Sequence, residues 1–147
     1  FVKPLDQTQG KGIEKYTCGG MLRNRSLYKK FMSLDPSIAE EYIHQHPKMA
    51  ELSPSSVNTV RLTTLYKDGI CHYLYSVLRM GSGSVVDNFH AGGIAASVDV
   101  HTGRVSTDAV NLEGEVFSVH PVSGIVIKEF EIPHWDQIFP DPAWGYR

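Results

Sequence analysis

The most regular alternation of bulky and polar positions lies in the middle of the chain, between residues 57 and 79. The first half of this stretch has a bulky side chain at every second position, namely Val60, Leu62, Thr64 and Tyr66. A period of two is that of a strand with one face toward a core. Lys67-Asp68-Gly69 interrupts the alternation, and residues 70–79 are strand-like again. The pattern therefore predicts a β-hairpin.

The loop of this hairpin admits two lengths, and its length decides which side chains share a face of the sheet. A two-residue turn at Asp68-Gly69 places Arg61 and Arg79 on opposite faces. A three-residue loop that includes Lys67, with a left-handed glycine and a bulge, places both arginines on one face. This second register, which is the one we test, pairs Tyr66 with Ile70, Arg61 with Tyr75 and Arg79 with Val57. The two arginine Cα atoms would then be offset by about 13 Å along the strands.

The remaining elements form a small α/β region before the hairpin and a mostly antiparallel sheet after it. The expected elements before it are strands at residues 1–4 and 13–18 around a polar loop at 7–12, a helix at 21–34, and a short helix at 46–52. The expected elements after it are a strand at 93–100, a turn at 101–103, an irregular segment at 105–112, a hairpin of 115–119 with 124–128, and a helix within 132–139. Residues 39–43 fit either a helix, which Asp35-Pro36 would start, or a strand.

Length and composition describe a protein with one core or two small lobes. The 147 residues are 41% hydrophobic and 20% charged, as in an ordinary soluble protein, and the net charge of −2 argues against nucleic-acid binding by bulk electrostatics. No apolar run approaches the ~20 residues that cross a bilayer, and no signal peptide opens the chain. Cys18 and Cys71 lack metal-ligand spacing, so we expect reduced thiols in a cytoplasmic protein. Both ends look cut, so we expect a part of a longer polypeptide.

Polar groups and glycines gather around the end of the second hairpin strand. Arg79 carries a planar cation suited to phosphate or carboxylate, Asn88 both donates and accepts, and Gly92-Gly93 lets the backbone approach a ligand. Arg61 lies in mid-strand on a face of threonines, an unusual place for an unpaired charge. These features indicate an anion site, and the alternative is a β-bend with a solvated arginine.

Five segments in this order resemble the sugar-transfer-associated ATP-grasp family. The matching segments are residues 1–6, 10–15, 40–47, 56–61 and 79–93. The resemblance implies an α+β class and a partial ATP-grasp fold, with a small α/β lobe followed by a mostly antiparallel β-sheet lobe. Residues 1–45 would belong to the nucleotide-covering lobe and residues 46–147 to the C-terminal lobe, which together grip ATP. The resemblance also implies that residues 39–43 are a strand that links the lobes.

The same resemblance implies roles for individual residues. The cofactor-binding candidates are Lys3, Gly10, Lys11, Gly12, Glu40, Glu41, Tyr42, Ile43 and His46. Lys3 resembles the lysine that contacts the nucleotide phosphates, and the turn at residues 10–12 resembles the mobile loop that closes over them. The linker at residues 40–43 resembles the segment that holds the adenine edge, and His46 resembles a contact to the ribose. The catalytic candidates are Arg61, Arg79 and Asn88, which resemble the donors that hold the terminal phosphate and the acyl phosphate.

Proteins of this kind use ATP to activate a carboxylate, which a nucleophile then attacks. The resemblance therefore implies an ATP-dependent carboxylate ligase that forms an acyl phosphate, and the family name points to modification of cell-envelope polysaccharide or peptide. ATP and Mg²⁺ are the implied cofactors, and the carboxylate and the nucleophile are not identified by the sequence. No acidic-x-Asn motif follows Trp144, so we expect the metal ligands outside this chain and the chain alone to be inactive. The alternative is a non-catalytic, β-rich module that binds a nucleotide or a carbohydrate.

Overall fold

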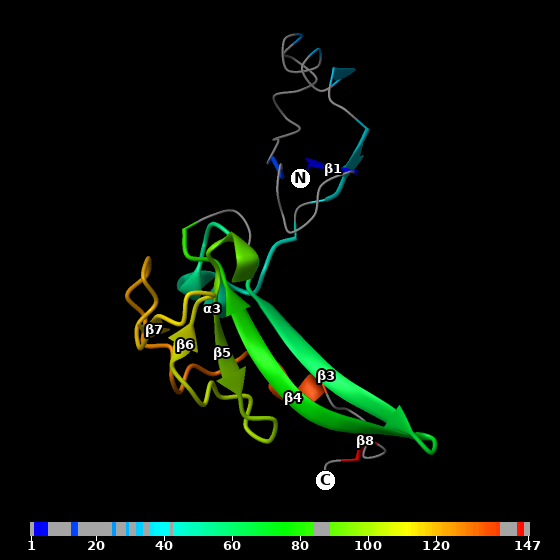
Figure 1. Ribbon diagram of the computed structural model, residues 1–147, viewed down its shortest axis with the longest axis vertical. Helices are drawn as coiled ribbons and strands as arrows, with labels where there is room; N and C mark the ends of the chain where they lie inside the picture. The colour runs from blue at the N-terminus through cyan, green and yellow to red at the C-terminus, as the bar shows by residue number, and fades with distance from the viewer. Residues whose placement is uncertain are drawn as a thin grey trace. The chain divides into compact units, whose positions relative to one another are not determined.

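The structure is a computed structural model that describes residues 2–5, 13–14, 25, 29, 32–33, 36–41, 43–83, 89–138 and 144–145. Contacts between residues divide the chain into two units, Phe1–Ile43 and His44–Arg147 (Figure 1). The assignment of residues 1–45 to a nucleotide-covering lobe and of residues 46–147 to a C-terminal lobe stays a prediction.

The first unit contains a two-stranded antiparallel sheet. β1 (Val2–Pro4) pairs with β2 (Ser37–Ala39), and Lys3 lies opposite Ile38. Val2 also exchanges two backbone hydrogen bonds with Glu14, with N···O distances of 2.8 and 2.9 Å. This bridge confirms at one residue pair that the start of the chain pairs antiparallel with the segment from residue 13.

The residues directly after Asp35-Pro36 form the strand β2 and not a helix. They form a strand because β1 offers them hydrogen-bond partners, and tertiary pairing outweighs the local helix signal. The strand ends at Ala39, so the expected strand at residues 39–43 is placed too late in the sequence. The predicted loop at residues 7–12 and most of the predicted helix at residues 21–34 lie outside the described residues.

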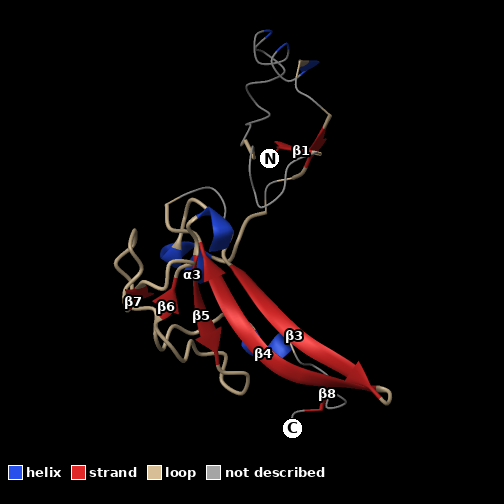
Figure 2. Ribbon diagram, viewed as in Figure 1, coloured by secondary structure: helices blue, strands red, loops and turns tan. Residues whose placement is uncertain are grey.

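The second unit contains a mostly antiparallel sheet (Figure 2). In the described part of the chain, the strand order is β3 (Thr59–Lys67), β4 (Ile70–Met80), β5 (Ile94–Val98), β6 (Ala109–Val110) and β7 (Val116–Phe117). β8 (Trp144–Gly145) adds a short parallel pairing to β4 at Cys71 and His72. The few helices and the antiparallel sheet confirm the expected α+β class and agree with a partial ATP-grasp fold.

The turn between β3 and β4 has two residues, so the predicted three-residue loop is wrong. Lys67 pairs directly with Ile70, and Asp68 and Gly69 between them have φ angles of 53° and 80°. Positive φ at both central residues is what a type I′ turn requires, and such a turn matches the twist of the flanking strands. Asp-Gly favours this turn because glycine lacks a Cβ and aspartate tolerates the left-handed region.

The hairpin carries its bulge inside the strand pair and not at the turn. Thr63 pairs with Tyr75, whereas Thr64 pairs with Tyr73, which leaves Leu74 without a partner in the ladder. An unpaired extra residue on one strand shifts all pairs on one side of it by one position. Side chains on the turn side of Leu74 therefore alternate out of phase with those on the other side.

This bulge puts the two arginines on one face, as predicted, but through different pairs. Arg61 lies opposite Val77, and Arg79 lies opposite Thr59. The predicted pairs, Arg61 with Tyr75 and Arg79 with Val57, are each wrong by two residues. A shift of two preserves the face because side chains alternate with a period of two, so the shared face is confirmed.

A chain of hydrogen bonds spans the bulge. The Tyr73 hydroxyl donates to Ser76 Oγ at 2.7 Å, and Ser76 Oγ donates to the Val98 carbonyl oxygen at 2.9 Å. Tyr73 and Ser76 are three residues apart and share a face only because Leu74 is unpaired between them. Burial raises the pKa of Tyr73, so its hydroxyl stays protonated and can donate.

The core lies on the face of the sheet opposite to the arginines. Leu78 and Met80 of β4 are fully buried, and α3 (Pro47–Leu52) packs Met49 and Leu52 against the same cluster. The short helix that Pro47 opens is thus confirmed. Burying a side chain such as Leu78 contributes about 1.5–3 kcal/mol, so the core fixes the rotation of β4. Because Leu78 and Met80 point into the core, Arg79 between them points to the open face.

A turn at residues 99–103 packs against an aromatic side chain from the end of the second unit. Gly103 has a φ of 69°, and a Cβ placed there would lie 2.3 Å from Trp135 Cγ. The indole Nε1 of Trp135 donates to the Val100 carbonyl oxygen at 2.7 Å. Only glycine combines this left-handed backbone with such a close approach. The predicted turn at residues 101–103 is thus confirmed.

The segments after this turn depart from the sequence prediction in detail. The predicted hairpin of residues 115–119 and 124–128 is present as a bridge between Val119 and Val126. The segment expected to be irregular, residues 105–112, contains β6, which pairs with β7. The helix expected within residues 132–139 is a single 3₁₀ turn, η2 (Trp135–Gln137). A second 3₁₀ turn, η1 (Phe89–Ala91), precedes β5.

Candidate phosphate-binding pocket

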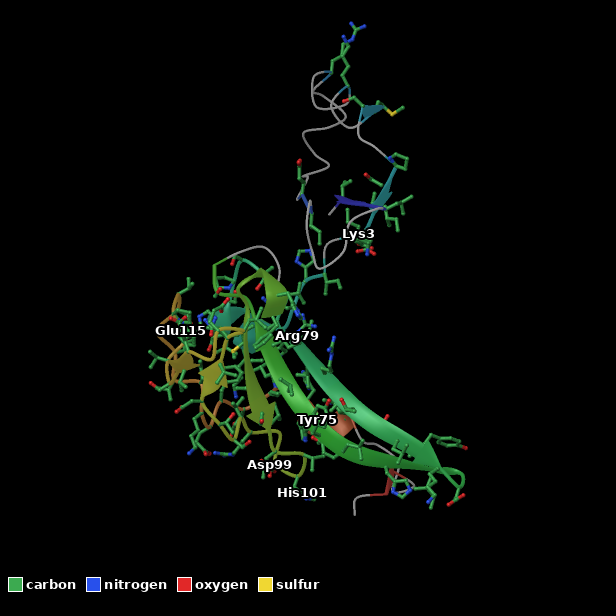
Figure 3. All side chains as sticks on the ribbon, viewed as in Figure 1. Lys3, Tyr75, Arg79, Asp99, His101 and Glu115 are labelled. Atoms are coloured by element: carbon green, nitrogen blue, oxygen red, sulfur yellow. The ribbon has the colours of Figure 1, made fainter. Side chains whose placement is uncertain are left out.

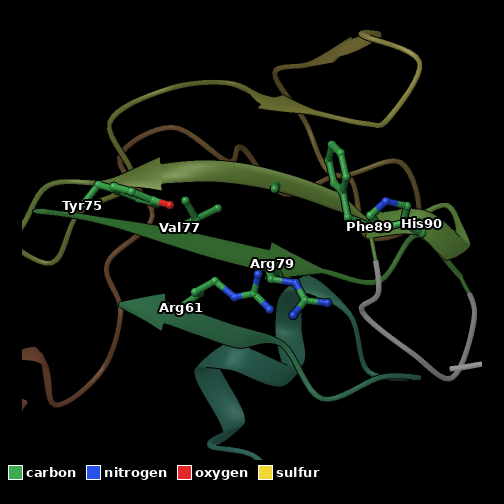
Figure 4. A pocket seen from close by; sticks show the side chains of 7 residues that line it. Arg61, Tyr75, Val77, Arg79, Phe89 and His90 are labelled. Atoms are coloured by element: carbon green, nitrogen blue, oxygen red, sulfur yellow. The ribbon is translucent and has the colours of Figure 1, made fainter. Parts of the chain in front are cut away.

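The open face of the β3–β4–β5 sheet contains a pocket of about 420 Å³. Its lining residues are Arg61, Tyr75, Val77, Arg79, Phe89, His90 and Ala95. Figure 4 shows the guanidinium groups of Arg61 and Arg79 directed into this pocket, with Phe89 and His90 of η1 at one end of it. The pocket therefore joins three strands and a 3₁₀ turn that are separate in sequence.

The two arginines are closer than the sequence predicts. Because Arg79 lies opposite Thr59, Arg61 is its diagonal neighbour two residues along β3. Diagonal neighbours across an antiparallel pair lie about 7–8 Å apart, compared with the predicted offset of about 13 Å. Arg61 is exposed and Arg79 is half-buried, and the described residues that line the pocket include no carboxylate. Two guanidinium groups on one face of the sheet make this pocket a candidate site for an anion.

The strand that carries Arg61 is held at its start by a carboxamide pair, the buried Asn58 and the half-buried Gln45. The side-chain Nδ2 of Asn58 donates to the Met49 carbonyl oxygen at 2.6 Å and to Gln45 Oε1 at 3.1 Å. Its backbone N–H also donates to Gln45 Oε1, at 3.0 Å, and Gln45 in turn donates to the carbonyl oxygens of Ser53 and Ser56. The pair thus ties β3 to α3 through fixed geometry. Sequence reasoning assigned neither residue a role.

The end of the strand that carries Arg79 is held by His120, which sequence reasoning also left without a role. The ring Nε2 of His120 lies 2.8 Å from the Gly81 carbonyl oxygen, two residues after Arg79. The backbone N–H groups of Val122 and Ser123 donate to Nδ1 at 3.3 Å, which fixes the neutral tautomer with its proton on Nε2. Burial lowers the pKa of His120 and favours this neutral form.

The candidate residues of the first unit include an ion pair. Lys3 Nζ donates to Glu40 Oε1 at 2.5 Å, and both side chains are partly exposed (Figure 3 labels Lys3). Glu41 and Ile43 are exposed beyond β2. The remaining candidates of this unit, Gly10, Lys11, Gly12 and Tyr42, lie outside the described residues.

Two further candidates belong to the second unit. The side chain of His46 accepts a hydrogen bond from the Lys48 N–H at the start of α3, and its ring makes an edge contact with His134 at 5.2 Å between centroids. This capping contact accounts for His46 structurally, and a contact to ribose stays a prediction. Asn88 lies outside the described residues, so its place beside the arginines stays a prediction as well.

Across the described ranges, no three His, Cys, Asp or Glu side chains are grouped so that they could hold a metal ion. No described helix is long and apolar enough to cross a membrane.

A comparison with protein families finds one match to this chain. Residues 23–140 match the family described as sugar-transfer associated ATP-grasp. The matched range covers more than half of the chain and includes both pocket arginines, whereas Lys3 lies before it. No curated protein and no solved structure gives a match. The chain therefore belongs to the sugar-transfer associated ATP-grasp family.

Proposed function

We propose that the protein binds ATP and uses it to convert a carboxylate into an acyl phosphate, as an ATP-dependent carboxylate ligase. The observation that supports this proposal is the pair of guanidinium groups, Arg61 and Arg79, in one pocket on the open face of the sheet. Each guanidinium is planar and presents several fixed donors, so the pair can hold a phosphoryl group from two sides. Family membership supports ATP as the source of that group.

In the proposed reaction, a carboxylate oxygen of the substrate attacks the terminal phosphorus of ATP. A new O–P bond forms while the bond from that phosphorus to the bridging oxygen breaks, which gives ADP and an acyl phosphate. Arg61 and Arg79 neutralise the charge on the transferred phosphoryl oxygens, and Asn88 is the third proposed donor. A nucleophile then attacks the acyl carbon, and inorganic phosphate leaves with the electron pair of the broken C–O bond.

We assign the rest of the nucleotide to the cofactor-binding candidates. Lys3 would contact the phosphates by exchanging its Glu40 partner for phosphate oxygens. The glycine-lysine-glycine turn at residues 10–12 would cover the phosphates, the linker from Glu40 to Ile43 would hold the adenine, and His46 would contact the ribose. Mg²⁺ accompanies ATP in this family. The family name supports a role in the modification of cell-envelope polysaccharide or peptide.

We expect the arginine pair to make the protein bind ATP more tightly than ADP. If both side chains hold the terminal phosphate, Arg61→Ala and Arg79→Ala should each weaken ATP binding by about 1.5–3 kcal/mol, the worth of a hydrogen bond to a charged group. ADP lacks that phosphate, so its affinity should change much less. Isothermal titration calorimetry of both nucleotides on each folded variant measures the difference.

Arg104→Ala is the matched control, because this arginine belongs to the same unit but pairs with Glu129 and Glu131 away from the pocket. It should leave both affinities unchanged. Equal losses of ATP and ADP in the pocket variants would refute the placement of the terminal phosphate. In a polypeptide that also contains the expected metal ligands, selective ATP binding without any carboxylate-dependent release of ADP would instead favour the non-catalytic binding module.

A further inference from the structure

The arginine pocket has more room and a more apolar lining than a phosphoryl group requires. Its volume of about 420 Å³ falls within the range of pockets that bind small organic ligands. Arg61, Arg79 and His90 supply its cationic and polar groups, whereas the other lining side chains are aromatic or aliphatic. A site that held only a phosphate would gain nothing from this second kind of surface.

The apolar part of the pocket follows directly from the strand register. Val77 lies opposite Arg61 on β4, and Ala95 of β5 lies opposite Arg79, so both stand on the face that carries the guanidinium groups. Tyr75 precedes Val77 on the same face and is 54% exposed. Figure 4 shows Tyr75 at one end of the pocket and Phe89 at the other, with Val77 between them.

Two aromatic rings therefore bound a short aliphatic floor, and the guanidinium groups lie at one side of that floor. The Phe89 ring is oriented by an edge contact with His90, with ring centroids 6.4 Å apart. A hydrogen bond from Ser82 Oγ to the Gly92 carbonyl oxygen fixes the residue that follows η1. A ligand that matches this surface has an anionic end and an apolar, flat body.

We infer that the carboxylate substrate is an aryl or similarly flat, apolar carboxylic acid, whose body lies over Val77 and Ala95 between Tyr75 and Phe89. This inference rests on the proposed function, since it takes the carboxylate end to face the phosphate held by Arg61 and Arg79. A hydroxyl-rich acid, such as a sugar acid, would lose water from its hydroxyl groups against Val77 and Ala95 without gaining partners there. The pocket therefore discriminates by the body of the acid.

The test titrates three probes into the protein: benzoate, acetate and glucuronate. The side-chain methyl groups of Val77 and Ala95 are observed by NMR. Benzoate should shift both methyl resonances and bind at least about tenfold more tightly than acetate, since a buried ring adds several carbon atoms to the apolar contact. Glucuronate should bind no better than acetate. Equal affinities for benzoate and acetate, or tightest binding of glucuronate, would overturn the inference.

Val77→Thr sharpens the test because it keeps the branched shape while replacing one methyl group of the floor by a hydroxyl. It should lower the affinity for benzoate several-fold more than that for acetate. Val126→Thr is the control, since Val126 is 61% exposed on a hairpin outside the pocket, and it should leave both affinities unchanged. An unaltered benzoate preference in folded Val77→Thr would remove Val77 from the site and overturn the inference.

The nucleotide arm separates this inference from the proposed function. If Arg61→Ala reduces ATP affinity selectively but benzoate shows no preference over acetate, the ligase proposal stands and the aryl substrate class falls. If Arg61→Ala changes the affinities for ATP and ADP equally, the proposed function is refuted, and the inference is refuted with it.

Discussion

Replacing Gly103 with alanine should destabilise the second unit by about 2–5 kcal/mol. The backbone at Gly103 has a φ of 69°, and this left-handed conformation costs a residue with a Cβ about 1–2 kcal/mol. The new methyl would also lie 2.3 Å from Cγ and 2.5 Å from Cβ of Trp135. Displacing a packed side chain costs about 1–3 kcal/mol, and the indole hydrogen bond to Val100 would be strained as well.

Gly124→Ala separates these two contributions. Gly124 has a φ of 72°, nearly that of Gly103, but nothing lies within 4 Å of the Cβ that the substitution would add. This variant should therefore lose only the backbone term of about 1–2 kcal/mol. The difference between the two variants measures the contact with Trp135 alone.

Urea denaturation followed by circular dichroism gives both values. We expect a lower unfolding midpoint in Gly103→Ala at an unchanged slope, because the change affects stability and not the surface exposed on unfolding. Tryptophan fluorescence should report a displaced indole in Gly103→Ala and not in Gly124→Ala. Equal midpoints for the two variants would show that the close approach of Trp135 has no energetic weight.

Two further predictions concern charge. Lys3→Ala should weaken ATP binding by about 1.5–3 kcal/mol without loss of the fold, and unchanged affinity in calorimetry would remove Lys3 from the nucleotide site. Burial lowers the pKa of His120 in the folded protein below the value of about 6.5 that it has in the unfolded chain. The stabilising contribution of neutral His120 is therefore fully present above about pH 6.5. It is lost as the pH falls through the folded pKa, because the unfolded chain takes up the proton first. Urea unfolding from about pH 7.5 to about pH 5 should show this loss, and His120→Gln should reduce it. A wild-type curve no steeper than that of the variant would contradict it.

The face shared by Arg61 and Arg79 could be predicted from sequence, but its cause could not. Alternation and the Asp68-Gly69 turn signal are local, so both strands and the turn position follow from them. The bulge at Leu74 lets a two-residue turn coexist with the burial of Leu78 and Met80 on one face of β4. A local sequence pattern does not contain this requirement. The prediction placed the extra residue at the turn. The two arginines still share a face because one bulge, at either place, shifts the alternation of side chains by one residue.

Residues whose contacts are distant in sequence were not predicted at all. His120 contacts Gly81 across 39 positions, and Asn58 contacts Gln45 across 13. Neither residue breaks a periodicity or forms a motif, so no local signal marks it. The strand at Ser37–Ala39 shows that a local signal can also mislead. Its pairing with β1 overrides the helix-start signal at Asp35-Pro36.

The bulge at Leu74 also has a consequence for how the gene can change. In a hairpin without a bulge, a codon gained or lost at the turn would exchange the two faces of one strand and carry Arg79 into the core. Here the ladder already contains one unpaired position, so a change of one residue at the turn can be absorbed by removing or re-forming the bulge. Insertions and deletions in relatives should therefore concentrate between Thr63 and Tyr75, while the spacing from Tyr75 to Arg79 stays constant. The tip of the hairpin is then free to diverge without altering the pocket.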